Sequence, residues 1–280
     1  MAKKVERAPQ YYASPLNNPM LNYSEYYMSA FEKILYTILV IIAGGVAGFI
    51  FYGGLFKSDG EATMATYISN LIIFVVVGLV AAKIFVPVIN KMLLAKRNKK
   101  LENQFMNFLE TLATSLSAGS TMHDAVISSK DDLLNQFSEK DMIIVELKEI
   151  IAGIENGITM EDMLANFGAR SYNENIVNFS NVISNCYRLG GNFSSVVRNT
   201  RELISDKIAV ADEIATKVSS NKLQLNAMSL MPIALVGMLK MTSGDFASNL
   251  ASPVGVIVTT IAIGIFAAAY IWGQKIINIR

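Results

Sequence analysis

The chain has 280 residues, of which 52% are hydrophobic and 17% are charged, a composition more apolar than that of a typical soluble domain. Its 24 Lys and Arg nearly balance its 23 Asp and Glu, so no overall basic field exists to drive nucleic-acid binding. One Cys (Cys186) and one His (His123) cannot build a disulfide framework, a zinc site or a Cys/His nucleophile pair within a single chain.

Residues 1–33 are polar and rich in tyrosine, and they lack the short apolar region and cleavage site of a signal peptide. We expect them to form a cytoplasmic tail. In one interpretation, residues 21–33 lie on the membrane surface through their Tyr and Phe rings. In the other, the tail is disordered.

Residues 34–89 predict two transmembrane helices. Ile34–Phe56 is a run of 23 uncharged residues, which as a helix spans about 34 Å against a hydrocarbon core of about 30 Å. A second uncharged run, Ala62–Ala82, continues past Lys83 to Ile89, and Lys83 is near enough to its end to extend its ammonium to the interface.

Residues 223–280 predict two further spans and a short C-terminal tail. Leu223–Leu239 has 17 uncharged residues, which is near the lower limit for a transmembrane helix. Pro253–Gln274 has 22, with Tyr270 and Trp272 near its end, where interfacial aromatic residues collect.

The distribution of Lys and Arg predicts the orientation of the four spans. The loops within each pair of spans carry Lys57 alone and Lys240 alone. Many more basic residues flank the other ends of the spans, namely Lys3, Lys4, Arg7, Lys33, Lys91, Lys96, Arg97, Lys99, Lys100, Lys275 and Arg280. Both termini and the region between the pairs are therefore expected in the cytoplasm.

Residues 90–222 predict a helical domain. This block holds 32 of the 47 charged residues, and its apolar residues recur at intervals of three and four. We expect six helices, paired as three αα-hairpins, near residues 90–118, 121–135, 138–155, 159–171, 174–189 and 192–231.

Turn chemistry repeats between the paired helices. The sequence Gly119–Val126 is echoed by Gly157–Leu164, and a fainter copy begins at Gly191. Glycine can close one helix in the left-handed conformation, and Thr or Asn can cap the next. The predicted turn and cap residues are Gly119, Thr121, Asp124, Gly157, Thr159, Asp162, Gly190, Gly191 and Asn192.

Two helices are expected to pass from the domain into the spans without a break, because residues 88–118 and 193–231 contain neither Gly nor Pro. Along the second, an apolar stripe with a seven-residue period could pack on a neighbour over its full length. Its members are Val197, Ile204, Ala211, Val218 and Leu225.

The sequence lacks the residue sets expected of an ion transporter or a nucleotide-binding protein. No ionisable residue lies in the middle of any predicted span, which disfavours ion or proton transport. Gly190-Gly191-Asn192 lacks the lysine of a P-loop, so we expect a turn there and no nucleotide site. The basic cluster at residues 96–100 sets orientation in one interpretation and docks an acidic partner in the other.

The stretches Phe105–Val126, Glu149–Leu164 with Arg170, and Leu189–Phe193 with Arg201 resemble the type II secretion system F domain. The resemblance covers about half of the chain. It implies a cytoplasmic six-helix bundle on a platform protein of the bacterial inner membrane. One F domain flanked by two pairs of spans resembles Tad (tight adherence, Flp pilus) platform subunits of the B or C type.

This resemblance implies partners and no catalysis. The expected partners are a hexameric secretion ATPase, a second F-domain platform protein, pilin subunits and the lipid bilayer, with no nucleic acid, cofactor or metal. Polar faces carrying Glu149, Arg170, Arg188 and Arg201 are candidate partner contacts, although salt bridges within the bundle explain each of them as well. A small permease and a membrane-anchored scaffold or signalling protein are the alternative functions.

Overall fold

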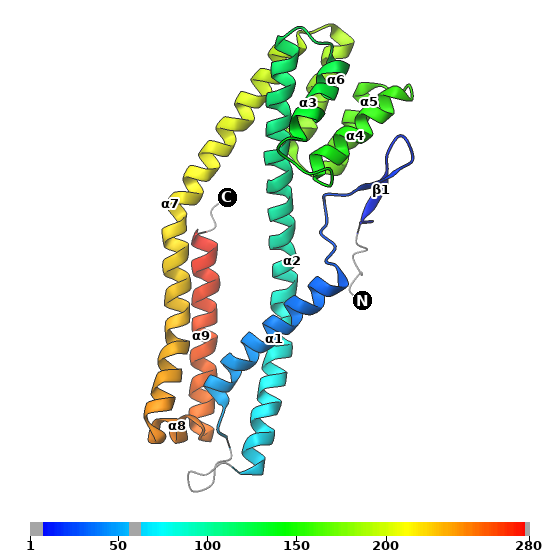
Figure 1. The fold of residues 1–280 in the computed structure, drawn as a ribbon. Helices are drawn as coiled ribbons and strands as arrows, with labels where there is room; N and C mark the ends of the chain where they lie inside the picture. Colours follow the sequence, from blue (N-terminus) through cyan, green and yellow to red (C-terminus); the bar gives the residue numbers. More distant parts are fainter. Residues whose placement is uncertain (1–7, 56–62, 278–280) are drawn as a thin grey trace, which may run out of the picture. The chain divides into compact units, whose positions relative to one another are not determined.

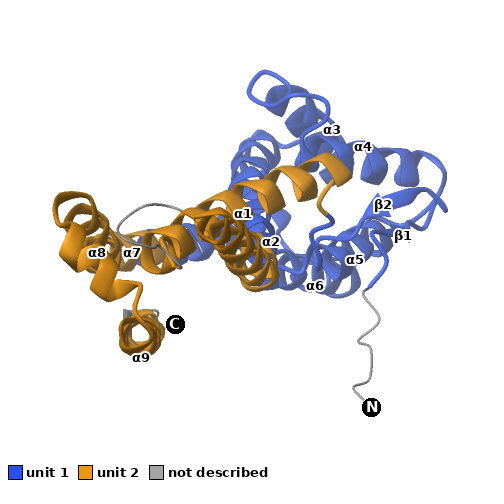
Figure 2. Cartoon of the chain, turned by 90° about the horizontal axis from the view of Figure 1, so that it is seen from below, with its two compact units in different colours: residues 1–27, 90–210 blue, residues 28–89, 211–280 orange. Residues whose placement is uncertain are grey.

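The computed structural model describes residues 8–55 and 63–277, and nearly all of this part of the chain is helical (Figure 1). It divides into two compact units (Figure 2). Unit 1 comprises the N-terminal residues up to Tyr27 together with Asn90–Val210, and unit 2 comprises Met28–Ile89 together with the residues from Ala211 onward. The predicted all-α membrane-protein architecture is confirmed, since four helices are long and apolar enough to cross a bilayer.

The helices follow the predicted order. They are α1 (Ala30–Tyr52), α2 (Met64–Ser117), α3 (Met122–Leu133), α4 (Met142–Glu155), α5 (Met160–Ser171), α6 (Glu174–Leu189), α7 (Phe193–Thr242), α8 (Gly244–Leu250) and α9 (Pro253–Ile277). Helix α4 begins four residues later than expected, because the backbone N–H of Ser138 donates to the Asp141 carboxylate in a turn (3.0 Å). Helix α8 was not predicted.

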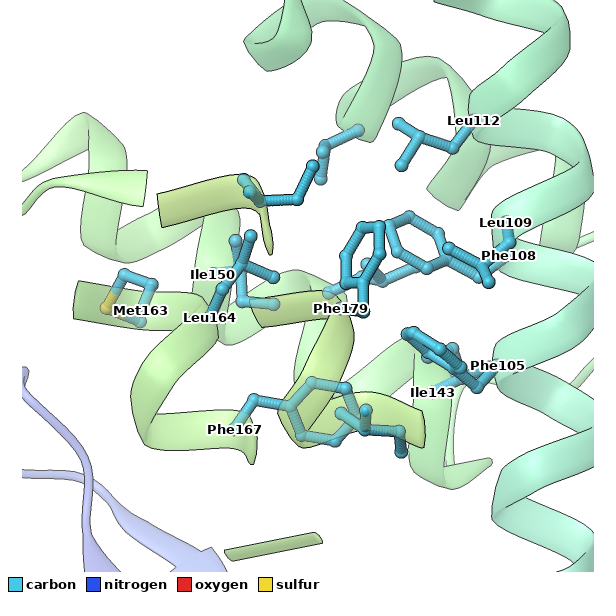
Figure 3. Close-up of a cluster of buried hydrophobic side chains, with 14 of the residues drawn as sticks. Phe105, Phe108, Leu109, Leu112, Ile143, Ile150, Met163, Leu164, Phe167 and Phe179 are labelled. Atoms are coloured by element: carbon cyan, nitrogen blue, oxygen red, sulfur yellow. The ribbon is translucent and has the colours of Figure 1, made fainter. Parts of the chain in front are cut away.

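An apolar core holds unit 1 together (Figure 3). Phe105 of α2 lies against Phe179 of α6 with ring centroids 5.4 Å apart and ring planes at 74°, the edge-to-face arrangement that aromatic pairs favour. Phe167 of α5 contacts Phe105 from another side, at 6.3 Å. Each of these rings is at most 2% exposed, and such burial stabilises the fold by about 2–3 kcal/mol per side chain.

Residues 8–27 belong to unit 1 and contact its core, which corrects the expectation of a disordered tail for these residues. Strands β1 (Tyr11–Ala13) and β2 (Pro19–Leu21) pair antiparallel, with Tyr12 opposite Met20. Tyr23 follows them and is 1% exposed within the core cluster. The alternative, that residues 21–33 lie on the membrane surface, stays a prediction; residues 1–7 lie outside the described part.

In each of the three turns within the hairpins, a glycine has a positive φ. Gly119, Gly157 and Gly190 have φ values of +92°, +82° and +68°. Apart from each glycine and its chain neighbours, no atom of the described residues lies within 4 Å of where a Cβ would stand on any of them, so the backbone conformation alone favours glycine there. At Gly191, in contrast, a Cβ would lie 3.0 Å from Sγ of Cys186.

Polar side chains cap the helices that follow these turns. The hydroxyl oxygens of Thr121 and Thr159 accept the backbone N–H of Asp124 and Asp162, each at 3.2 Å. The Asp124 carboxylate in turn accepts the Thr121 hydroxyl at 2.7 Å. The side chain of Asn192 accepts the backbone N–H of Ser195 at the start of α7 (3.2 Å).

In unit 2, small residues bring α1 and α2 together. A Cβ added to Gly44 would lie 2.6 Å from Cβ of Ala81, and one added to Gly48 would lie 2.9 Å from Cβ of Val77. Side chains larger than glycine at residues 44 and 48 would therefore collide with α2. Gly264 of α9 differs, because no atom of the described chain lies within 4 Å of its Cβ position.

Helices α2 and α7 are each unbroken from bundle residues into a candidate span. Their prolines, Pro87 and Pro232, lie within the predicted spans, where helices tolerate proline. The apolar stripe of α7 is partly packed within the chain, and its packing on a neighbour over its full length stays a prediction. Val197 and Ile204 are buried, whereas Ala211 is exposed.

Replacing Gly157 by Ala tests the turn geometry. Because the site is open but φ is positive, we expect the variant to lose about 1–2 kcal/mol of unfolding free energy through backbone strain alone. Asn, which tolerates this conformation, should cost less, and Val should cost more. Denaturant unfolding of the three variants measures the order; equal stability of all three would contradict the interpretation.

Candidate functional site

A buried ion pair is the most polar feature inside unit 1. The guanidinium of Arg170 (α5) donates to both carboxylate oxygens of Glu146 (α4), from Nη1 at 2.8 Å and from Nη2 at 2.6 Å. The two residues are 5% and 1% exposed. Such a bidentate ion pair is strong and directional. It is stable away from water only when the remaining hydrogen-bond donors and acceptors of both groups are also satisfied.

Asn166 accepts a hydrogen bond from Nε of Arg170 at 2.7 Å, and the N-terminal segment supplies further bonds. The hydroxyl of Tyr23 donates to Oε1 of Glu146 at 2.9 Å, and Nη1 of Arg170 donates to the backbone carbonyl of Leu21 at 3.2 Å. The backbone N–H of Tyr23 donates to the carbonyl of Arg170 at 2.9 Å. We call Tyr23, Glu146 and Arg170 the buried triad. It connects the N-terminal segment to α4 and α5.

Burial raises the pKa of Tyr23 well above its ordinary value, and the neighbouring Glu146 carboxylate raises it further. An ionised phenolate would stand beside a carboxylate in an apolar setting. Tyr23 is therefore a neutral hydrogen-bond donor in the folded protein at physiological pH.

Two further contacts hold the hairpin. The hydroxyl of Ser14 and the side-chain amide of Asn18 donate to the carboxylate of Glu149, one helical turn along α4 from the triad. The guanidinium of Arg97 (α2) lies over the rings of Tyr23 and Tyr26, with 5.6 and 5.3 Å from Cζ to the ring centroids. The N-terminal segment thus contacts α2, α4 and α5.

The four candidate partner contacts lie in different environments in the structure. Arg170 is inside unit 1 and bonded within the bundle, so its expected place on an exposed face is corrected. Glu149 is engaged by the hairpin. Arg201 lies 3.4 Å from Glu110 in a partly exposed pair. Arg188 is exposed at the end of α6, and its partner role stays a prediction.

Sequence reasoning missed Tyr23, Glu146 and Arg97 as interacting residues. A signal was present in the cluster of tyrosines near the N-terminus, since aromatic residues in a polar segment can anchor it to a core. The identity of their partners could not be read, because Tyr23 and Glu146 are 123 positions apart.

Polar groups in unit 2 are used for packing. Nζ of Lys240 donates to the backbone carbonyls of Ile50 and Gly53 at 3.1 and 2.5 Å, which places a cation at the C-terminus of α1. Asn70 accepts the backbone N–H of Gly54 at 2.8 Å. The Tyr270 hydroxyl donates to Asn226 between α9 and α7 at 3.3 Å.

Within residues 8–55 and 63–277, no group of three or more His, Cys, Asp or Glu side chains is placed to hold a metal ion. His123 lies in the first turn of α3, beside a cavity of about 560 Å³ between the two turns that contain Gly119 and Gly191.

Residues 108–241 match the family model described as type II secretion system (T2SS), protein F. The match begins in α2, includes α3–α6 and ends one residue before the end of α7. It supports the F-domain resemblance of the sequence, and it includes all of the turn and cap residues named above. Comparisons with curated proteins and with solved structures give no match.

The ion pair can be tested by Arg170→Ala, which leaves Glu146 buried without its cation. We expect a loss of about 3–5 kcal/mol in the free energy of unfolding of the bundle. The matched control is Arg188→Ala, at an exposed arginine, which should change stability by less than about 0.5 kcal/mol. Urea unfolding in detergent measures both, and equal effects would argue against the buried pair.

The raised pKa of Tyr23 predicts a loss of stability at high pH. An unfolded tyrosine ionises near pH 10, whereas the folded one stays protonated to higher pH, so its contribution is complete below about pH 10 and falls as pH rises further. Thermal unfolding followed by circular dichroism should show this fall. Tyr23→Phe should reduce it, and the exposed control Tyr11→Phe should preserve it.

Proposed function

We propose that this protein is a non-enzymatic platform subunit of the bacterial inner membrane, in a pilus-assembly or type II secretion-like machine. Its role is to couple a cytoplasmic hexameric ATPase to the extraction of pilin from the bilayer and its assembly into a filament. The observation that carries this proposal is the F-domain match on residues 108–241, held on two helices that each contain a candidate span.

Continuous helices suit mechanical coupling. A helix transmits a push or rotation along its axis where its backbone hydrogen-bond ladder is complete. Helices α2 and α7, of 54 and 50 residues, contain no proline between the bundle and their candidate spans, since Pro87 and Pro232 lie within the predicted spans. The buried triad adds a third connection, because the hairpin that it holds leads directly into α1. A force on the bundle therefore has three covalent routes towards the spans.

Charge supports the orientation in this proposal. The basic residues near the termini and in the region between the two pairs of spans outnumber those in the loops within each pair, which favours a cytoplasmic bundle and cytoplasmic termini. The arrangement of one F domain between two pairs of spans favours the Tad type. In that assignment, a second F-domain protein completes the platform.

Purification in mild detergent tests the proposal. We expect the tagged full chain to recover a hexameric ATPase and a second F-domain protein from its own host. Recovery of neither under several detergents would overturn it, and solute-dependent flux from the pure protein in liposomes would favour a permease instead.

Helix continuity can be tested by Ala215→Pro, at an exposed position of α7. Proline removes a backbone hydrogen bond and kinks the helix, at a cost of about 3 kcal/mol or more. We expect filament assembly to fall sharply while the ATPase still co-purifies. Ala215→Leu keeps the helix and is the matched control; normal assembly with the proline variant would contradict the coupling mechanism.

A further inference from the structure

A cavity of about 560 Å³ opens at one end of the bundle, between the first and third hairpin turns. Tyr187 of α6 and Phe193 of α7 line it with ring centroids 4.7 Å apart, and Leu116 and Met122 add aliphatic side chains. The two turns supply the rest of the lining, and none of the described lining residues is Asp, Glu, Lys or Arg. The cavity therefore suits an uncharged, apolar side chain of a partner.

Leu189, the last residue of α6, stands beside this cavity. It is 85% exposed, more than any other large apolar residue among the described residues of unit 1, and it is two positions before Gly191, which lines the cavity. A single exposed leucine is ordinary on a protein surface. A leucine next to an apolar recess gives one surface both a projection and a place that could receive it.

Opposite charges lie on the same surface. Arg188 precedes Leu189 and is exposed, and Glu161 lies in the first turn of α5. Burial raises the pKa of Tyr187, and the Glu161 carboxylate raises it further, so this carboxylate is near the ring that lines the cavity. Neither Arg188 nor Glu161 has a hydrogen bond or ion pair with another described residue. Both charges are available to a partner.

These features complement themselves. In a two-fold interface the same surface is used by both copies, so each projection meets the recess of the other copy and each cation meets the other's anion. A different protein would have to supply a matching apolar side chain, a matching recess and two charges, whereas a second copy of this chain has all of them. A two-fold axis along the bilayer normal also keeps the spans of both copies in the same orientation.

We infer that this end of unit 1 forms a two-fold interface with a second copy of the chain. Leu189 of each copy enters the cavity of the other, and Arg188 of each copy faces Glu161 of the other. The inference goes beyond the proposed function and does not depend on it, because it requires only two copies in one bilayer. It gives the exposed Arg188 a specific partner.

Self-association of the full chain in a mild detergent tests this interface. Energy transfer between two differently labelled samples measures the dissociation constant of the dimer. Leu189→Ala should weaken association about tenfold, since each dimer loses two buried leucines. Leu203→Ala, at a leucine of α7 that is 71% exposed and does not line the cavity, should change it less than about twofold. Equal effects, or an unaltered chain that stays monomeric at every detergent ratio, would overturn the inference.

Charge reversal tests the paired sides of the surface. Arg188→Glu and Glu161→Arg should each weaken association about tenfold at low salt, and Arg198→Glu, at an exposed arginine that does not line the cavity, should not. The chain with both Arg188→Glu and Glu161→Arg should associate with itself again but not with the unaltered chain. Circular dichroism confirms that each variant is folded. Failure of the double variant to recover association would contradict the assigned pairing.

Disulfide formation locates the contact. In a Cys186→Ala background, copies with Leu189→Cys are mixed with copies that carry Ser120→Cys, at an exposed residue of the cavity lining. We expect a cross-link between copies. Tyr172→Cys, at a residue that is 71% exposed at the end of α5, replaces Leu189→Cys in the control and should give none. Equal cross-linking of the two mixtures, or none in either, would overturn the inference.

These outcomes are separate from those of the proposed function, because neither an ATPase nor a pilin is present in these experiments. A chain that does not self-associate overturns this interface and leaves the platform role to the co-purification experiment. Failure to recover an ATPase overturns the platform role and leaves the interface unaffected.

Discussion

Two opposite charges in the apolar interior of unit 1 constrain the rest of that unit. The carboxylate of Glu146 and the guanidinium of Arg170 have lost their water, and a charge in that setting is tolerated only with a complete set of bonds. The pair satisfies part of that requirement by itself. The Tyr23 hydroxyl and the Leu21 carbonyl supply further bonds, and so the N-terminal hairpin is a structural part of the bundle.

The bilayer imposes a different constraint on unit 2. Backbone groups in hydrocarbon must bond within their own helix, and the few polar side chains there must find partners nearby. Lys240 meets this requirement at the C-terminus of α1, and Asn226 meets it with Tyr270. Lipid provides no hydrophobic driving force for helix association, so helices in a bilayer associate through close packing. Small residues such as Gly44 and Gly48 allow α1 and α2 to approach closely.

Unit 1 has the composition of a water-soluble bundle, with an aromatic core, capped helices and glycine turns. Any protein that binds this unit would contact its surface, where charge is arranged by helix faces. A groove of about 310 Å³ shows how this arises, because residues of α2 with a simple helical spacing line it together with Phe137 from the turn between α3 and α4.

Most of the helices, the candidate spans and the hairpin turns could be predicted from the sequence, although helix α8 could not. These depend on residues within a few positions of one another: the apolar period of three and four, the length of an uncharged run, and the glycine and cap at residues 157 and 159. The resemblance to an F domain followed from the same local patterns.

The place of the N-terminal segment and the contacts of Arg170 depend on the tertiary structure. The spacing of Tyr23, Glu146 and Arg170 along the chain carries no information about their meeting, because that depends on how the helices of unit 1 and the hairpin pack around one core. The short strands were missed for the same reason: they contain three residues each, and packing on the bundle stabilises a pair that would be marginal alone.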